Sequence, residues 1–186
     1  MAEVLVLITG DGASITKSSL ELLTMARRIG EPSAVVFGSE VDTEVLSRYG
    51  GATVYLFEGT EYADFLVAPK ADALAALVAD RKPAAVLMTS TAEGKEIGAR
   101  VALRSGAGFV YDAVDVFAGE QGPTTVQSVF AGNFTVTSSF AQQSGAVIAV
   151  KPNATTPTEV SDPAAGVVQV VPHTVAESAK GARVTA

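Results

Sequence analysis

The alternation of aliphatic runs with amphipathic segments through the first 110 residues constrains the fold more than any other feature of this sequence. Residues 4–8 form an unbroken run of Val, Leu and Ile, which is typical of a strand buried on both faces of a parallel sheet. Similar runs predict further strands at residues 34–37, 53–57, 84–88 and 109–110. Between them, apolar residues recur at roughly a 3.6-residue spacing. These stretches predict helices at residues 16–29, 41–49, 69–82 and 94–105.

Strands that alternate with helices are joined by right-handed crossovers, which make the strands parallel and place helices on both faces of the sheet. The first part of the chain therefore predicts an α/β fold with a doubly wound, mostly parallel sheet. In the helix expected at residues 94–105, Glu96 and Arg100 are four residues apart and should form a stabilising ion pair.

A β-rich region of low charge follows at residues 105–150. It contains no Lys or Arg, and its only charged residues are Asp112, Asp115 and Glu120. Two segments of alternating polarity predict strands at residues 124–130 and 134–140, and a further apolar run predicts one at residues 147–150. Gly132-Asn133 lies between the first two. Because these residue types tolerate positive φ, we expect an additional β-hairpin or a bulge here.

The end of the chain has the composition of a connecting segment. Pro152, Pro157 and Pro163 indicate a loop, a strand is predicted at residues 167–171, and residues 178–182 resemble a linker. We therefore expect an α/β domain at residues 1–151. Residues 152–186 should form the proline-containing loop, the further strand and a linker toward a domain beyond this chain.

Composition excludes several classes of function. The chain has 186 residues, of which 48% are hydrophobic and 18% charged, as expected for a globular protein. A net charge of -7 argues against nucleic acid as a partner. The absence of Cys and the presence of one His, His173, argue against thiolate zinc sites, iron–sulfur clusters and His-based metal or catalytic sites. The N-terminal apolar run is too short to span a membrane and lacks the pattern of a signal peptide, so we expect a cytoplasmic protein.

Two glycine-containing segments are candidates for phosphate binding. The turn Gly10-Asp11-Gly12 begins like a dinucleotide fingerprint, but Ile15 stands where the third glycine belongs, so a structural strand-to-helix turn is the better interpretation. Gly94-Lys95 does not complete a phosphate loop, because the first glycine and the magnesium-binding hydroxyl are missing. The free N–H groups of this helix start, together with Lys95, could still hold an anion; ordinary helix capping beside a solvated lysine is the alternative.

The remaining polar residues do not form a catalytic set. His173 lies beside Pro172 and is expected to be a solvated loop residue. Asp112 and Asp115 should point to opposite faces of a strand, so neither is assigned a role. An acyl or phosphoryl transfer enzyme would need a base and a metal set, which we do not find. The chain is therefore not expected to be an enzyme.

Three segments together resemble the alpha subunit of electron transfer flavoproteins, in the same order and at similar spacing: residues 20–30, residues 94–102 with their Gly-Lys start, and residues 129–134 with Ala-Gly-Asn. The resemblance runs from about residue 4 to residue 152. It implies a Rossmann-like domain similar to the adenine nucleotide alpha hydrolases, followed in the complete subunit by a second domain that holds most of the FAD contacts. The Ser-Gly-Gly-Arg-Gly turn with which that second domain opens is absent from this chain.

The resemblance implies an FAD-containing heterodimer with a beta subunit, which carries electrons from acyl-CoA or other dehydrogenases to a quinone-linked acceptor. No FAD-binding residue of the family maps onto this chain, so no cofactor is expected on this chain alone. The charge-poor region suits a subunit interface, because such interfaces exclude unpaired charge from their centres. Gly132, Asn133 and Phe134 are the interface candidates, and Gly94 with Lys95 remains the candidate anion site. The alternative is a stand-alone adenine-nucleotide-binding domain of the stress-protein type.

Overall fold

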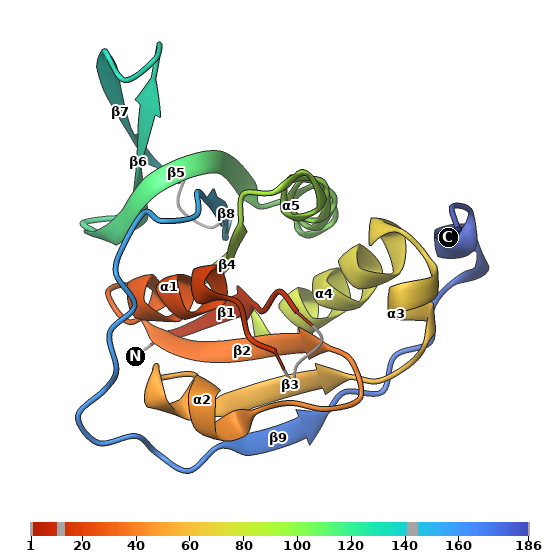
Figure 1. Cartoon of the computed structure of the whole chain (residues 1–186). Coiled ribbons are helices and arrows are strands. Elements are labelled where there is room, and N and C mark those ends of the chain that lie inside the picture. Colours follow the sequence, from red (N-terminus) through yellow and green to blue (C-terminus); the bar gives the residue numbers. More distant parts are fainter. Residues whose placement is uncertain (1, 11–13, 141–144, 186) are drawn as a thin grey trace.

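The expected strands come together in one mixed sheet. In the computed structural model, which describes residues 2–10, 14–140 and 145–185, nine strands lie in the order β7-β6-β5-β8-β4-β1-β2-β3-β9 (Figure 1). The strands are β1 (Glu3–Leu7), β2 (Glu31–Phe37), β3 (Thr53–Phe57), β4 (Ala85–Thr89), β5 (Gly108–Gly119), β6 (Gly122–Val129), β7 (Phe134–Ser139), β8 (Ala146–Val150) and β9 (Val167–Val170). The helices are α1 (Lys17–Ala26), α2 (Thr43–Arg48), α3 (Glu61–Asp64), α4 (Val67–Arg81) and α5 (Ala92–Ser105), with a 3-10 helix at Glu177–Lys180.

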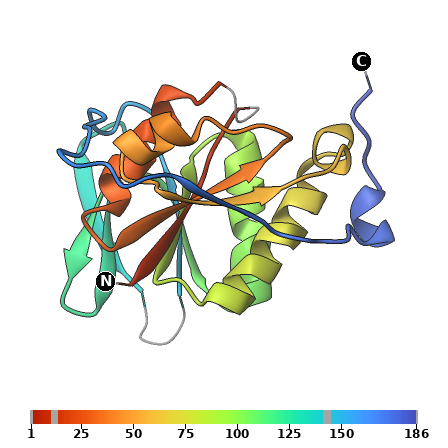
Figure 2. The same ribbon diagram turned by 90° about the horizontal axis from the view of Figure 1, so that it is seen from below.

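Strand β1 lies at the centre and is buried on both faces. Val4 and Val6 pack into the core beneath α1 and α2, while Leu5 and Leu7 pack into the core beneath α4 and α5. Seen from below, the two pairs of helices lie on opposite sides of the sheet (Figure 2). The strands from β5 to β9 in the sheet order pair in parallel, and only β6 runs antiparallel to its neighbours, β5 and β7. The doubly wound, mostly parallel α/β fold is thus confirmed.

Helix α1 ends three residues earlier than its apolar pattern predicts. Arg27 is its C-cap, and the chain reaches Glu31, the first residue of β2, through a tight turn. Gly30 lies in this turn, where a Cβ atom would lie 2.3 Å from the carbonyl oxygen of Ala2. The short helix α3 and the 3-10 helix were not predicted. Among the described residues, no helix has the length and apolar character needed to cross a membrane.

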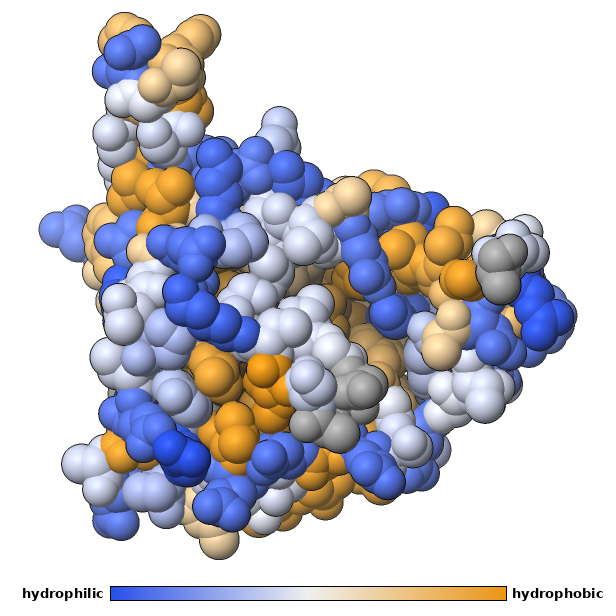
Figure 3. All heavy atoms as spheres, viewed as in Figure 1, coloured by the Kyte–Doolittle hydropathy of each residue, from blue (hydrophilic) through white to orange (hydrophobic). Residues whose placement is uncertain are grey.

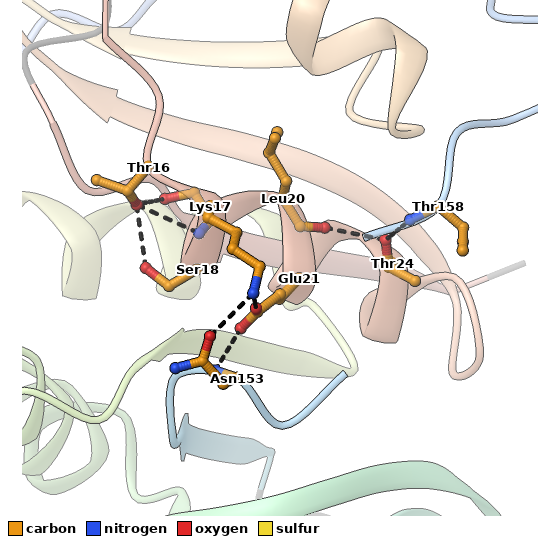
Figure 4. Close-up of polar contacts among 9 residues, drawn as sticks. Thr16, Lys17, Ser18, Leu20, Glu21, Thr24, Asn153 and Thr158 are labelled. Carbon is orange, nitrogen blue, oxygen red and sulfur yellow. Dashed lines mark hydrogen bonds and ion pairs between the residues drawn. The ribbon is translucent and has the colours of Figure 1, made fainter. Parts of the chain in front are cut away.

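The connection from β8 to β9 crosses one face of the molecule. Residues 151–166, called the strap here, run over α1 and α2 to the far edge of the sheet, where β9 pairs with β3 in parallel (Figure 1). The backbone N–H of Asn153 donates to Oε2 of the buried Glu21 at 2.8 Å (Figure 4). The N–H of Thr158 donates to Oγ1 of Thr24 at 3.1 Å (Figure 4). Helix α1 therefore satisfies backbone groups of the strap with buried side chains.

The residues after β9 also pack on the domain. Contrary to the linker-like composition, residues 177–180 form a 3-10 helix, and Ala179 and Val175 are buried in the same core as α4. The N–H of Leu66 donates to the carbonyl of Ala182 at 2.9 Å. The predicted division at residue 151 coincides with the first residue after β8, but the chain beyond it returns to the same sheet.

Helix α5 begins in close contact with β4. A Cβ atom at Gly94 would lie 2.0 Å from the carbonyl oxygen of Thr89, which is part of the strand backbone and cannot move independently. The glycine therefore allows the first turn of α5 to approach the end of β4. This close approach gives Gly94 a structural role, independent of any ligand.

Gly94→Ala should lower the free energy of unfolding by about 1 to 3 kcal/mol, because the added methyl group must displace the strand or the helix start. The change is expected although alanine favours helices over glycine. Gly181→Ala is the matched control, since no atom lies within 4 Å of a Cβ there and φ is -70°. Urea denaturation of both variants measures the difference. Equal stability of Gly94→Ala and the wild type would contradict the close approach.

The carboxylate of Glu3 accepts three hydrogen bonds at the amino ends of the central strands. Its Oε1 accepts from Ser33 Oγ at 2.7 Å and from the Tyr55 hydroxyl at 2.9 Å, and its Oε2 accepts from Arg81 Nε at 3.2 Å. Burial of the ring, followed by the hydrogen bond to Glu3, raises the pKa of Tyr55 to about 12. The folded state therefore holds this phenol proton more tightly than the unfolded chain does.

Because the folded pKa of Tyr55 lies above the unfolded value, the stability that it contributes should be present below about pH 10 and lost between about pH 10 and about pH 12. In urea denaturation across this range, wild type should lose stability more steeply than Tyr55→Phe, which cannot ionise. Tyr111→Phe removes the hydroxyl group of an exposed tyrosine and is the control, expected to keep the wild-type slope. Identical slopes for wild type and Tyr55→Phe would refute the assignment.

Candidate functional site

The hairpin of β6 and β7 projects from one end of the sheet (Figure 1). Strand β7 is the edge strand, and five of its six residues are exposed. In the space-filling view, apolar residues lie at the tip and at the base of this projection (Figure 3). The additional hairpin predicted from the sequence is present, and it extends away from the core rather than covering it.

The turn of the hairpin has an unusual backbone. Phe130, Ala131 and Gly132 have φ values of 50°, 55° and 88°. Asn133 donates from its backbone N–H at 3.2 Å and from Nδ2 at 2.9 Å to the carbonyl of Phe130. The turn lies where Gly132-Asn133 predicted it, but positive φ begins at Phe130 and does not include Asn133. A bulky aromatic residue rarely adopts positive φ, which costs free energy that the rest of the turn must offset.

The strained turn displays two phenylalanine rings. The side chains of Phe130 and Phe134 are 77% and 63% exposed, and their ring centroids lie 5.7 Å apart in an edge-to-face arrangement. Val136, two residues from Phe134 and therefore on the same face of β7, is also exposed. The centres of protein interfaces are enriched in aromatic residues and poor in charged ones, and this surface has both properties. Phe134 is therefore not a core residue, and the hairpin is the first candidate site.

The second candidate site lies at the start of α5. Thr91 caps this helix by accepting from the N–H of Gly94 at 3.0 Å. The ammonium of Lys95 lies 2.8 Å from Oδ1 of Asp112 and 5.5 Å from the ring centroid of Tyr111. The hydrogen bond from Lys95 lowers the pKa of Asp112. An external anion would have to compete with this carboxylate for Lys95.

Asp112 reaches Lys95 because β5 bends. Its φ is 56°, its N–H donates to Ser90 Oγ at 3.1 Å, and Ser90 Oγ donates back to its Oδ1 at 2.7 Å. The sequence assigned no role to Asp112, because regular alternation would place it and Asp115 on opposite faces of a strand. The positive φ of Asp112 interrupts that alternation. In the structure Asp112 neutralises Lys95. The predicted pair of Glu96 with Arg100 is confirmed, with 2.7 Å between Arg100 Nη2 and Glu96 Oε1.

A small pocket lies at the point where the strand order reverses, between the carboxyl ends of β1 and β4. Doubly wound folds bind ligands at this position. Thr9, Gly10, Thr89 and Gly94 contribute to the lining, and Oγ1 of the buried Thr89 has no hydrogen-bond partner among the described residues. As enclosed by the described residues, the pocket measures about 70 Å³. Nucleotide-sized ligands need several hundred Å³, so this geometry does not favour the adenine-nucleotide alternative.

The other described residues that the sequence offered as site candidates make contacts that stabilise the fold. Gly10 has a φ of 123°, as expected for a strand-to-helix turn, while Asp11 and Gly12 lie outside the described residues. His173 is partly buried rather than fully solvated: its Nδ1 lies 3.1 Å from the Tyr62 hydroxyl, its ring packs edge-on against Phe57, and burial lowers its pKa. Over residues 2–10, 14–140 and 145–185, no cluster of three or more His, Asp or Glu side chains could hold a metal ion.

Phe130 and Tyr111 belong to the two candidate sites but were not singled out in the sequence. Phe130 ends a predicted strand and Tyr111 directly follows one. Aromatic residues at such positions usually pack in a core, and their pattern alone does not indicate exposure. For Phe130, its place directly beside the Gly-Asn turn could have indicated a hairpin tip.

Comparisons with known proteins place most of the chain in one known family. The family model described as the electron transfer flavoprotein domain matches residues 4–176. An electron transfer flavoprotein subunit alpha from Mycobacterium tuberculosis (strain ATCC 25618 / H37Rv) is 40% identical over 188 aligned positions, covering 98% of this chain and 56% of that protein. The subunit of the same name from Mycobacterium leprae is 44% identical over 140 residues, covering 73% of this chain and 43% of that protein.

A more distant relative, the electron transfer flavoprotein subunit alpha of Syntrophomonas wolfei, is 27% identical over 135 residues, which cover 71% of this chain and 43% of that protein. The chain thus spans about half the length of the curated relatives that it matches. The family match covers most of the chain, and each of these relatives is an alpha subunit. On this evidence, the chain belongs to the electron transfer flavoprotein family, among its alpha subunits.

Proposed function

We propose that this chain is the N-terminal scaffold domain of an electron transfer flavoprotein alpha subunit, which binds a beta subunit through the hairpin of β6 and β7. The observation that carries the proposal is the exposed pair Phe130 and Phe134 on a strained turn. In the complete heterodimer, electrons would pass from acyl-CoA or other dehydrogenases through FAD to a quinone-linked acceptor. The scaffold itself performs no chemistry. A cytoplasmic location remains part of the proposal.

The hairpin meets the physical requirements of an interface. Strand β7 leaves one edge of the sheet without a partner among the described residues, and unprotected edges of this kind pair readily with other chains. Charged residues are absent from both of its strands, so a partner would not have to desolvate an unpaired charge there. The two rings supply the large apolar contacts that typically account for most of the binding free energy.

The described residues do not fit FAD. A cavity of about 620 Å³ lies at the amino ends of β4 and β8 and is bordered by Lys82 and Arg104 at the C-terminal ends of α4 and α5. The partial negative charge of these helix ends disfavours a pyrophosphate, which binds at helix N-termini. We therefore place the flavin in a part of the alpha subunit beyond this chain, together with the beta subunit.

Phe134→Lys should abolish or strongly weaken beta-subunit binding and leave the melting temperature unchanged, because Phe134 is exposed in the free chain. A lysine at the centre of an interface would become a buried, unpaired charge, which should weaken the affinity at least about 100-fold. Titration calorimetry with the beta subunit measures binding, and thermal unfolding measures stability. Leu103→Lys, at an 85% exposed position on α5, is the matched control and should bind normally.

The possible outcomes separate three roles for Phe134. Loss of binding at an unchanged melting temperature supports the interface. Loss of both would indicate a core residue, against the exposure described above. A Phe134→Lys variant that binds as tightly as the wild type would show a solvated edge and refute the proposed surface.

The 186-residue chain alone should retain neither FAD nor adenine nucleotide, because its flavin contacts are expected elsewhere and the switch-point pocket is too small. After incubation with FAD, AMP or ATP and exhaustive dialysis, the absorbance spectrum should show protein only. A stoichiometric yellow complex would contradict the scaffold role. Retained AMP or ATP, released in a Lys95→Ala variant, would instead favour the stand-alone nucleotide-binding domain.

A further inference from the structure

A groove rich in hydrogen-bond donors lies between the end of α1 and the strap, away from both candidate sites. Its volume is about 500 Å³. It is lined by Thr24, Arg27, Arg28, Thr155, Thr156 and Thr158. The set consists of two adjacent guanidinium groups and four threonines, in a chain whose net charge is -7. This composition is unusual for a surface that only connects two segments.

Both guanidinium groups are held in place. Nη2 of Arg27 donates to the carbonyl oxygen of Thr158 at 2.6 Å and to its Oγ1 at 2.8 Å. Nη1 of Arg28 donates to Oδ1 of Asp115 at 2.7 Å, and Nη2 donates to Oγ1 of Thr155 at 3.1 Å. A ligand that bound here would therefore meet arginines whose rotamers are already fixed, which reduces the entropic cost of binding.

The hydroxyl groups of the groove are left as donors. Oγ1 of Thr155 and Oγ1 of Thr158 each accept a hydrogen bond from an arginine, so the hydrogen of each hydroxyl remains available. Thr156 has no hydrogen-bond partner among the described residues and is exposed. Thr24 is fully used, because it donates to Leu20 and accepts from Thr158. The free threonine hydroxyls of the groove therefore favour a ligand whose polar atoms only accept hydrogen bonds.

The charge of the groove is not balanced. Asp115 is the carboxylate paired with Arg28, whereas the side chain of Arg27, over the part of the chain that the structure describes, donates only to Thr158. Glu21, one and a half turns earlier on α1, is committed to Lys17 and to the N–H of Asn153 (Figure 4). Nε of Arg27 is buried and has no acceptor within residues 2–10, 14–140 and 145–185. Burial first, and then the positive charge of Arg28, lower the pKa of Arg27. A bound anion would relieve this excess of positive charge.

We propose that this groove binds the phosphate group of a small-molecule ligand, held by Arg27 and Arg28 and by the hydroxyls of Thr155, Thr156 and Thr158. A tetrahedral phosphate presents acceptor oxygens in several directions and can use guanidinium and hydroxyl donors from both walls at once. A planar carboxylate, with two oxygens, leaves part of this donor set unused. The site is independent of the proposed interface, because it lies on α1 and the strap rather than on the hairpin.

The test is a calorimetric titration of the 186-residue chain with inorganic phosphate, with sodium chloride added to keep the ionic strength constant. Wild type should bind phosphate saturably, with acetate binding more weakly. Arg27→Gln should weaken phosphate binding about ten-fold or more, because a charge-assisted donor is lost. Arg100→Gln, which removes one positive charge from α5, is the matched control and should bind as wild type does.

Arg27→Gln also removes two hydrogen bonds to the strap and could destabilise the fold. A second variant therefore tests the groove without changing either arginine. Thr156→Glu keeps both arginines and places a carboxylate in the groove, so it should abolish phosphate binding and keep or raise the melting temperature. Three results would overturn the proposal: no saturable phosphate binding by the wild type, equal affinity in wild type, Arg27→Gln and Thr156→Glu, or acetate binding as tight as phosphate binding.

Discussion

The architecture depends on the burial of β1 on both of its faces. Residues 4–7 are at most 4% exposed, and alternate side chains belong to two separate cores. Buried backbone groups must be hydrogen-bonded, so β1 has to be paired along both edges, with β2 on one side and β4 on the other. The same requirement explains why helices cover both faces. The reversal of strand order beside β1 follows from this central position.

The fold was predictable where all residues of an element share one environment, such as burial within the sheet, because the sequence pattern then reflects that environment directly. Residues 53–57 are an example, because the predicted and observed bounds of β3 coincide. Helix α3 was missed because it has four residues and no side-chain cap, which leaves little signal in the sequence. The strand at Val167–Val170 was predictable, but its neighbour was not. That pairing depends on where the strap runs, which is decided by contacts with Glu21 and Thr24 on a distant helix.

The candidate sites were predictable in position but not in geometry. Gly132-Asn133 indicated a turn, yet residue type could not show that Phe130 adopts positive φ, since L residues other than Asn and Asp rarely do so. Asp tolerates positive φ better than Phe does, but the strand pattern around Asp112 did not show that this residue adopts it, bends β5 and turns its carboxylate toward Lys95. The strap groove joins residues 24–28 to residues 155–158, a sequence separation that no local motif spans.

The pairing of β9 with β3 has a consequence for synthesis of the protein on the ribosome. The two strands are more than 100 residues apart, so the nascent chain exposes the open edge of β3 until Val167–Val170 has emerged. The strands from β1 to β4 can assemble long before that moment, because their contacts lie closer in sequence. During this interval the unpaired edge of β3 is a template for association with other chains.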